Sequence, residues 1–252
     1  MHDTVNTIEA AASALSQAIA GGMRLAALPG PGPASEAQAY AVQDAIIRAV
    51  GTRGGWKVSP LREGKARCSP IPARFFVDAP AQFDTGFLDG CLAEVEIAVR
   101  FREDPLGQGR ALSPAKLADC IASVHPAVEL LSSRFAAPDS APDLHRLADL
   151  QGCVAVILGA ATTDWAALEF AELPFALALA GQEVSLKVNS PTTEQTLEAL
   201  CWLADHAAAR GAPLKAGDVV ITGARLGPVS LQGVRDCRAR IGTLGPVALS
   251  AR

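Results

Sequence analysis

Hydrophobic residues recur at helical spacing in three long stretches of the chain. Residues 6–22 begin near a polar cap and end in a glycine pair, and residues 35–51 begin with Ser35 and Gln38 at the spacing of a capping box. The third stretch, residues 192–211, is the longest and closes at a glycine. The pattern therefore predicts three helices, of which two lie at the N-terminal end.

Other segments alternate between apolar and polar residues or are continuously apolar, as strands are. The clearest are residues 92–101 ("LAEVEIAVRF"), 126–135 ("PAVELLSSRF") and 153–159 ("CVAVILG"). Residues 60–90 are punctuated by prolines, so no helix is expected there. Shorter strands are predicted over residues 54–58, 181–188, 216–224, 227–233 and 240–250, and short helices over residues 113–124 and 164–171.

This succession of elements predicts an α+β protein. A helical section of residues 1–52 comes first, and a strand-rich body with intercalated helices follows over residues 53–252. We find no repeat and no low-complexity tract in the sequence. We expect the two sections to form one continuous domain.

Composition narrows the class of protein. Half of the 252 residues are hydrophobic, and the formal net charge is −4. Because nucleic-acid binding needs clustered Lys and Arg, this balance gives no reason to expect it. The N-terminus is acidic where a signal peptide would be basic, and the longest apolar run is far shorter than the roughly 20 residues that span a bilayer. Six scattered cysteines without a CxxC pair are typical of reduced thiols. We therefore expect a cytoplasmic protein without a membrane segment.

Two carboxylates interrupt the strand of residues 92–101. Side chains alternate along a strand, so Glu94 and Glu96 share one face, about 7 Å apart, while Val95 and Ile97 share the other. One interpretation is a solvated outer face of an antiparallel sheet. The other is a site for a hard divalent cation, Mg²⁺ or Mn²⁺, which needs further oxygen ligands.

Residues elsewhere in the chain could complete such a site. Glu129 lies alone inside an apolar run, where an unpaired charge would be costly, and could supply a third carboxylate. No His or Cys lies at ligand spacing to these glutamates, which disfavours zinc. Lys57 follows Trp56 after a glycine pair. It could extend along the surface to solvent, or it could be held in an apolar pocket with a lowered pKa and transfer protons.

The order of these segments resembles the 2-keto-4-pentenoate hydratase and 2-oxo-3-hexenedioate decarboxylase family, within the fumarylacetoacetate hydrolase superfamily. The resemblance covers about residues 36–250. The matching pieces, in order, are "AYAVQDAI", "GGWKV", "AEVEIAVRF", "PAVELLSSRF", "LADLQGCVAVILG", "WLADHAAARGAPLKAGDVVITGA" and "IGTLGPVAL".

The resemblance implies both a fold and a function. Members of the family fold as a distorted mixed β-roll with helices outside, and they form oligomers. Their hydratases add water to 2-hydroxypenta-2,4-dienoate in the degradation of aromatic compounds, with a divalent metal. Glu94, Glu96 and Glu129 match the family's metal ligands, and Lys57 matches its proton-transfer lysine. Association with a sister enzyme of the pathway is a further expectation.

Of the residues that the resemblance places near the substrate, some match the family pattern and others differ from it. Thr222 and Gly223 match an active-site turn, and Ser59, which replaces a family glycine, is taken with them as substrate-binding. The aspartate of a "PDxG" segment is missing. In the family's "ADNxxSG" segment Asp149 remains, whereas Leu150 replaces the asparagine and the serine is absent.

Three alternatives remain open. A decarboxylase would keep the same metal site and use an extra cation for a second substrate carboxylate, for which Arg62, Lys65 and Arg67 near the mouth are candidates. A catalytically inactive paralogue could act as a structural partner, and the missing motifs favour it. A C–C hydrolase is weakened because such relatives place a histidine on a segment before the paired acids, and this chain has none there.

Overall fold

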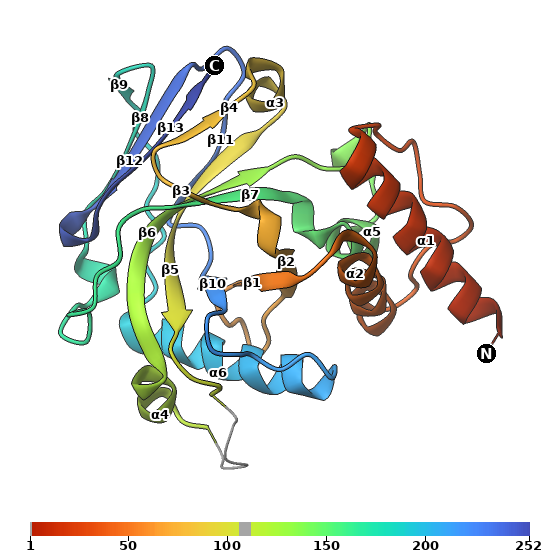
Figure 1. Ribbon diagram of the computed structural model, residues 1–252, viewed down its shortest axis with the longest axis horizontal. Helices are drawn as coiled ribbons and strands as arrows, with labels where there is room; N and C mark the ends of the chain where they lie inside the picture. Colours follow the sequence, from red (N-terminus) through yellow and green to blue (C-terminus); the bar gives the residue numbers. More distant parts are fainter. Residues whose placement is uncertain (1, 106–111) are drawn as a thin grey trace.

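Strands of two mixed sheets form the body of the protein in the computed structural model, which describes residues 2–105 and 112–252 (Figure 1). The larger sheet has eight strands, in the order β2 (Cys68–Pro72), β1 (Arg53–Val58), β10 (Val219–Ile221), β5 (Leu92–Phe101), β6 (Ile121–Leu131), β7 (Cys153–Leu158) and β3 (Phe76–Asp78), with β11 (Leu226–Ser230) also paired to β5. The second sheet has the order β4 (Ala81–Phe83), β13 (Gly245–Ala251), β12 (Asp236–Ile241), β8 (Phe175–Leu179) and β9 (Gln182–Glu183).

The antiparallel pair β5–β6 is the longest ladder and lies at the centre of the larger sheet. Alternation along β5 buries Val95 and Ile97 in the main hydrophobic core. The opposite face is also apolar toward the end of the strand, where Ala98 joins a second buried cluster with Ala127 of β6 and Ile221 of β10. Both faces of this sheet are therefore largely removed from water.

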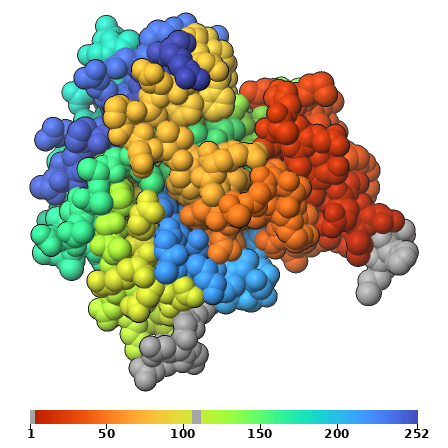
Figure 2. Space-filling model, in the orientation of Figure 1, coloured from red at the N-terminus to blue at the C-terminus, as the bar shows by residue number. Residues whose placement is uncertain are grey.

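Helices cover the flanks of the larger sheet. The pair α1 (His2–Gly21) and α2 (Glu36–Val50) packs together on one side, and α2 also contacts β2 and α5 (Asp143–Ala148). Figure 2 shows these N-terminal helices projecting beside the strand-rich body. Helix α6 (Thr193–Ala209) lies against α4 (Pro114–Asp119) and β1. None of the helices in the described residues is both long and apolar enough to cross a membrane.

The predicted starts of α2 and α6 agree with the observed caps, whereas α1 begins at His2 and not near the cap expected at residue 6. Ser35 accepts a hydrogen bond from the Gln38 N–H, and the chain turns out of α2 at Gly51, where φ is +127°. A reciprocal capping box opens α6: the Thr192 hydroxyl accepts from the Gln195 N–H at 3.1 Å, and the Gln195 side chain accepts from the Thr192 N–H at 2.9 Å. Two backbone N–H groups at the start of α6, which have no acceptor within the helix, are thereby hydrogen-bonded.

Several predicted boundaries were wrong. The helix predicted over residues 113–124 ends at Asp119, because β6 takes the chain from Ile121 onward. The strand predicted over residues 181–188 is restricted to β9, and only the 3₁₀ turn Phe170–Glu172 falls in the helix predicted over residues 164–171.

The proline-rich region also differs from expectation, since it holds the short helix α3 (Thr85–Asp89) as well as strands. The strand predicted over residues 240–250 is two strands, β12 and β13, joined at residues 242–244. The mixture of helices and strands agrees with the predicted fold class. The division of the chain near residue 52 stays a prediction.

Replacement of Thr192 by Ala removes the hydroxyl acceptor at the start of α6. We expect the free energy of unfolding to fall by about 1 kcal/mol, the usual value of an N-cap. Urea unfolding of the metal-free protein measures it. Thr192→Ser keeps the hydroxyl and should stay close to wild type, and a full-size loss in the serine variant would contradict the capping explanation.

Candidate metal centre

Three carboxylates converge on one face of the larger sheet. Glu94 and Glu96 extend from β5 and Glu129 from β6, and one carboxylate oxygen of each lies within 4.8 Å of the others. Glu96 and Glu129 are almost fully buried, while Glu94 is half-buried. The structure thus brings Glu129, the candidate third carboxylate, beside the pair on β5, and the role of the three as metal ligands stays a prediction.

The register of β5 and β6 explains this convergence. Glu94 and Glu129 are direct cross-strand partners, and Glu96 lies opposite Ala127. Partners in an antiparallel ladder project to the same side of the sheet, with Cβ atoms about 5 Å apart. Since Glu96 is two residues beyond Glu94, all three side chains share this face.

Burial makes the cluster electrostatically unfavourable in the absence of a cation. Burial raises the pKa of Glu96 well above its usual value, and repulsion from Glu129 and Glu94 adds to this. Burial likewise raises the pKa of Glu94 to about 6, although the Lys57 ammonium opposes the increase. Converging oxygen ligands with excess negative charge are what Mg²⁺ and Mn²⁺ prefer, so these residues fit a hard divalent cation.

Lys57 extends from β1 into the same cluster. Its ammonium donates to both carboxylate oxygens of Glu129, each at 2.7 Å, and its side chain is 13% exposed. Burial alone would lower the pKa of Lys57, but Glu129, Glu96 and Glu94 together raise it above its ordinary value. The suggested lowering of this pKa is therefore wrong for the metal-free protein, because the carboxylates outweigh the loss of solvent.

The turn after β10 holds Glu96 in place. The Gly223 N–H donates to Glu96 Oε2 at 2.6 Å. Gly223 has φ +93°, and a Cβ at this position would lie 2.8 Å from Pro60 Cδ, so both conformation and space require glycine. Thr222 is buried and its hydroxyl donates to the Ile97 carbonyl at 2.8 Å, which ties the turn to β5. Its predicted contact with substrate stays a prediction.

Ser59 lies further along the chain from Lys57, just beyond the end of β1. Its hydroxyl accepts from the Arg67 N–H at 3.0 Å and lines a cavity at the edge of the larger sheet. The hydroxyl is therefore already hydrogen-bonded to the backbone of Arg67, the residue before β2. Its proposed contact with substrate is not tested by this geometry.

Arg225 is a buried cation that the sequence analysis missed. It is 1% exposed, and its guanidinium donates to the carbonyls of Thr222 and Gly223 and to the Thr196 hydroxyl. Burial lowers its pKa to about 10, against the attraction of Glu96. It holds the turn that binds Glu96, and its position two residues after the "TG" pair was the available signal.

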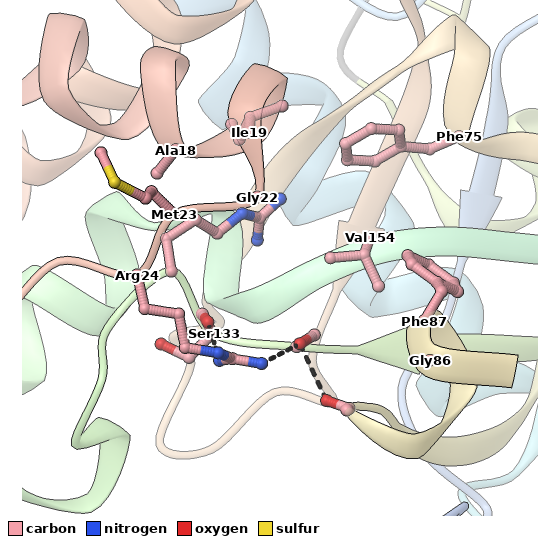
Figure 3. A pocket seen from close by; sticks show the side chains of 13 residues that line it. Ala18, Ile19, Gly22, Met23, Arg24, Phe75, Gly86, Phe87, Ser133 and Val154 are labelled. Atoms are coloured by element: carbon pink, nitrogen blue, oxygen red, sulfur yellow. Dashed lines mark hydrogen bonds between the residues drawn. The ribbon is translucent and has the colours of Figure 1, made fainter. Parts of the chain in front are cut away.

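A separate cavity of about 420 Å³ lies between the end of α1, α3 and the end of β6 (Figure 3). Phe75, Phe87 and Val154 contribute apolar surface, and Arg24 donates to Ser132 and to the Ser133 carbonyl. The three glutamates are not among its lining residues. This cavity is therefore separate from the carboxylate cluster.

Comparison with known proteins finds relatives from the family that the sequence motifs resemble. No family model matches the chain. A 2-keto-4-pentenoate hydratase of Burkholderia vietnamiensis (strain G4 / LMG 22486) is 29% identical, with 96% of each chain covered. A 2-hydroxyhexa-2,4-dienoate hydratase of Comamonas testosteroni is 30% identical over 52% of this chain, and this match spans about half (48%) of that relative's length.

A solved structure has the same fold over nearly the whole chain. The 4-oxalocrotonate decarboxylase from Pseudomonas putida G7, complexed with magnesium and adipate, superposes with a TM-score of 0.79 at 19% identity, covering 98% of each chain. The chain is similar to that decarboxylase in fold, and it is similar to the two hydratases in sequence. Together these relatives confirm that the chain resembles the 2-keto-4-pentenoate hydratase and decarboxylase family.

Proposed function

We propose that this protein is a divalent-metal-dependent hydratase. Its substrate would be a short 2-hydroxy-dienoate or 2-keto-enoate, such as 2-hydroxypenta-2,4-dienoate, formed in the degradation of aromatic compounds. The observation that carries the proposal is the buried cluster of Glu94, Glu96 and Glu129 with the Lys57 ammonium against it. The hydratase relatives support the same reaction class.

Each residue of the cluster has a role in this proposal. Glu94, Glu96 and Glu129 would hold Mg²⁺ or Mn²⁺, which when bound polarises the oxygens of a 2-keto acid and favours its enol form. Gly223 keeps the carboxylate of Glu96 directed into the cluster. The apolar residues around the cluster limit the access of water, which strengthens every electrostatic interaction there.

Lys57 is the residue that would move a proton. In the metal-free protein the carboxylates stabilise its ammonium form and raise its pKa. It could therefore donate to a substrate carbon as the dienol converts to the keto form, while Glu129 fixes the direction of the donor. Water addition at C4 would follow, and in this chain the residues that guide this water differ from the family pattern.

The sister decarboxylase reaction is the second candidate. It is favoured by the fold of the 4-oxalocrotonate decarboxylase and by the basic residues Arg62 and Lys65 in the cavity that Ser59 lines. We further propose that the two sheets form the β-roll expected from the family, and that the chain forms a homo-oligomer in the cytoplasm. Association with a sister enzyme of the pathway is part of the same proposal, and these points rest on the resemblance.

Metal binding is the first prediction of this function. Glu94→Gln together with Glu96→Gln removes two of the three negative charges, so the affinity for Mn²⁺ or Mg²⁺ should fall at least a hundredfold. Isothermal titration calorimetry measures it. Glu183→Gln removes an exposed carboxylate on the other sheet and should leave the affinity unchanged. If the double variant binds as tightly as wild type, the glutamates are not the metal site.

The affinity for Mg²⁺ should depend on pH. A proton on Glu94 competes with the cation, and its pKa of about 6 places this competition near neutrality. Affinity should therefore be greatest above about pH 7 and decrease as the pH falls through 6. Calorimetry across this range should give a shallower dependence for Glu94→Gln, and an affinity that rises with acidification would contradict the assignment.

Turnover tests the reaction itself. With Mg²⁺ and freshly generated 2-hydroxypenta-2,4-dienoate, the dienol absorbance should disappear and 4-hydroxy-2-oxopentanoate should form. Lys57→Ala should lower kcat by at least a thousandfold while leaving the metal affinity within several-fold. Loss of metal binding in this variant would make Lys57 structural. If the protein binds metal but converts no dienoate, by hydration or decarboxylation, it is an inactive paralogue and the proposal falls.

A further inference from the structure

The cavity between α1, α3 and the end of β6 has walls of two kinds (Figure 3). Ile19, Phe75 and Val154 line it with apolar surface, whereas Arg24 and Ser133 line another side with polar groups. Its volume of about 420 Å³ falls within the range of small-molecule sites, roughly 300 to 1,000 Å³. The cavity therefore has room for a small molecule with an apolar body and a polar end.

Arg24 is held at the polar wall by both its backbone and its side chain. The N–H of the next residue, Leu25, donates to the Arg134 carbonyl at 2.7 Å. The Arg24 guanidinium donates to the Ser133 carbonyl and to the Ser132 hydroxyl. These contacts tie the chain after α1 to the chain after β6, so the cation has a fixed position.

The positive charge of Arg24 has no carboxylate partner among the described residues. A guanidinium has more N–H groups than the two that Arg24 uses, and both of these donate to neutral oxygens. The other cation on the lining, Arg134, is already paired, with its Nε 3.5 Å from Asp149 Oδ1. None of the described lining residues is an aspartate or a glutamate. The cavity therefore favours an anion, and a planar carboxylate suits the guanidinium.

The apolar wall is incompletely covered. Phe87 is 39% exposed and Met23, just after α1, is 77% exposed, and both line the cavity. Phe87 stacks on Phe83 with ring centroids 5.3 Å apart, which fixes its position while leaving it partly open to solvent. A ring placed in the cavity would remove this apolar surface from water and could pack against the aromatic side chains.

The start of β7 separates this cavity from the candidate metal centre. The register of β7 with β6 shifts there, and two consecutive residues belong to different sides of the sheet. Cys153 joins the second apolar cluster, on the carboxylate side, whereas Val154 packs against the main core and lines the cavity. A ligand in the cavity would therefore not displace a cation from the three glutamates.

We propose that this cavity is a second binding site, separate from the metal centre, which takes a small aromatic monocarboxylate. The carboxylate accepts hydrogen bonds from Arg24, and the ring lies against Phe75, Phe87 and Val154. The inference goes beyond the proposed function and does not depend on it, because it uses neither the metal ligands nor Lys57.

Three fluorinated probes separate the contributions of ring and charge. The first, 4-(trifluoromethyl)benzoate, has both; 4-(trifluoromethyl)benzamide has the ring without the charge, and trifluoroacetate has the charge without the ring. Fluorine NMR titration of the metal-free protein at constant ionic strength measures each affinity. The benzoate should bind about tenfold to a hundredfold more tightly than either of the others, since a charge-assisted hydrogen bond contributes about this much.

Two variants test the two walls independently. Arg24→Gln should abolish the preference for the benzoate over the benzamide, whereas Arg238→Gln removes an exposed cation on the second sheet and should keep it. Gly86→Leu leaves Arg24 in place and adds a side chain to the lining, where a Cβ would meet no atom within 4 Å. By filling this space it should weaken the binding of both aromatic probes by about tenfold or more. Urea unfolding checks that each variant is folded.

The location of the probe is tested at the metal centre. Glu94→Gln together with Glu96→Gln should leave the affinity for the benzoate within about twofold of wild type, because the cavity does not include these residues. Loss of binding in this double variant would place the probe at the carboxylate cluster and contradict the inference. A preference for the benzoate that persists in both Arg24→Gln and Gly86→Leu would contradict it as well.

A second copy of the chain is the competing occupant of this face. In that case the benzoate should not bind, and Phe87→Ser should lower the mass of the protein in analytical ultracentrifugation, which would overturn the inference. Failure of the dienoate turnover would overturn the proposed function alone, because the benzoate is bound without metal and is not converted. Conversely, turnover without benzoate binding would leave the proposed function standing.

Discussion

The burial of three carboxylates on one face of the β5–β6 ladder determines how the surrounding residues are arranged. Glu96 and Glu129 are almost inaccessible to water, and an uncompensated charge in such a place costs on the order of several kcal/mol. Lys57 compensates Glu129, and the Gly223 N–H compensates Glu96. No hydrogen bond to Glu94 is found in the described part of the chain. A divalent cation would bind where this excess of negative charge remains.

This arrangement requires a sheet that is buried on both faces. Val95 and Ile97 anchor β5 in the main core, and Ala98 belongs to the second apolar cluster on the carboxylate side. The second cluster keeps water away from the charged groups, so their interactions with one another are strong. The same burial raises the pKa of Glu96, because it disfavours the negatively charged form. A bound cation would compensate this charge and so stabilise the folded site.

Local periodicity was sufficient to predict part of this site. The shared face of Glu94 and Glu96 follows from alternation within one strand, whereas the placement of Glu129 depends on the register of β5 with β6, which the family resemblance supplied. The boundary at residue 120 was missed because the apolar spacing of residues 113–124 fits a helix, while pairing with β5 imposes a strand from Ile121. Arg225 was missed because its role depends on a turn formed by distant strands.

The segment after Asp149 can change in sequence without disturbing the three glutamates. Leu150 and Gln151 have left-handed conformations that together cost on the order of a few kcal/mol, and the buried Leu150 side chain maintains them. This strain directs Gln151 toward Ser69, next to Lys57, and none of the three glutamates takes part in it. Substitutions in this segment can therefore alter the position of Gln151, while the carboxylates on β5 and β6 keep their register.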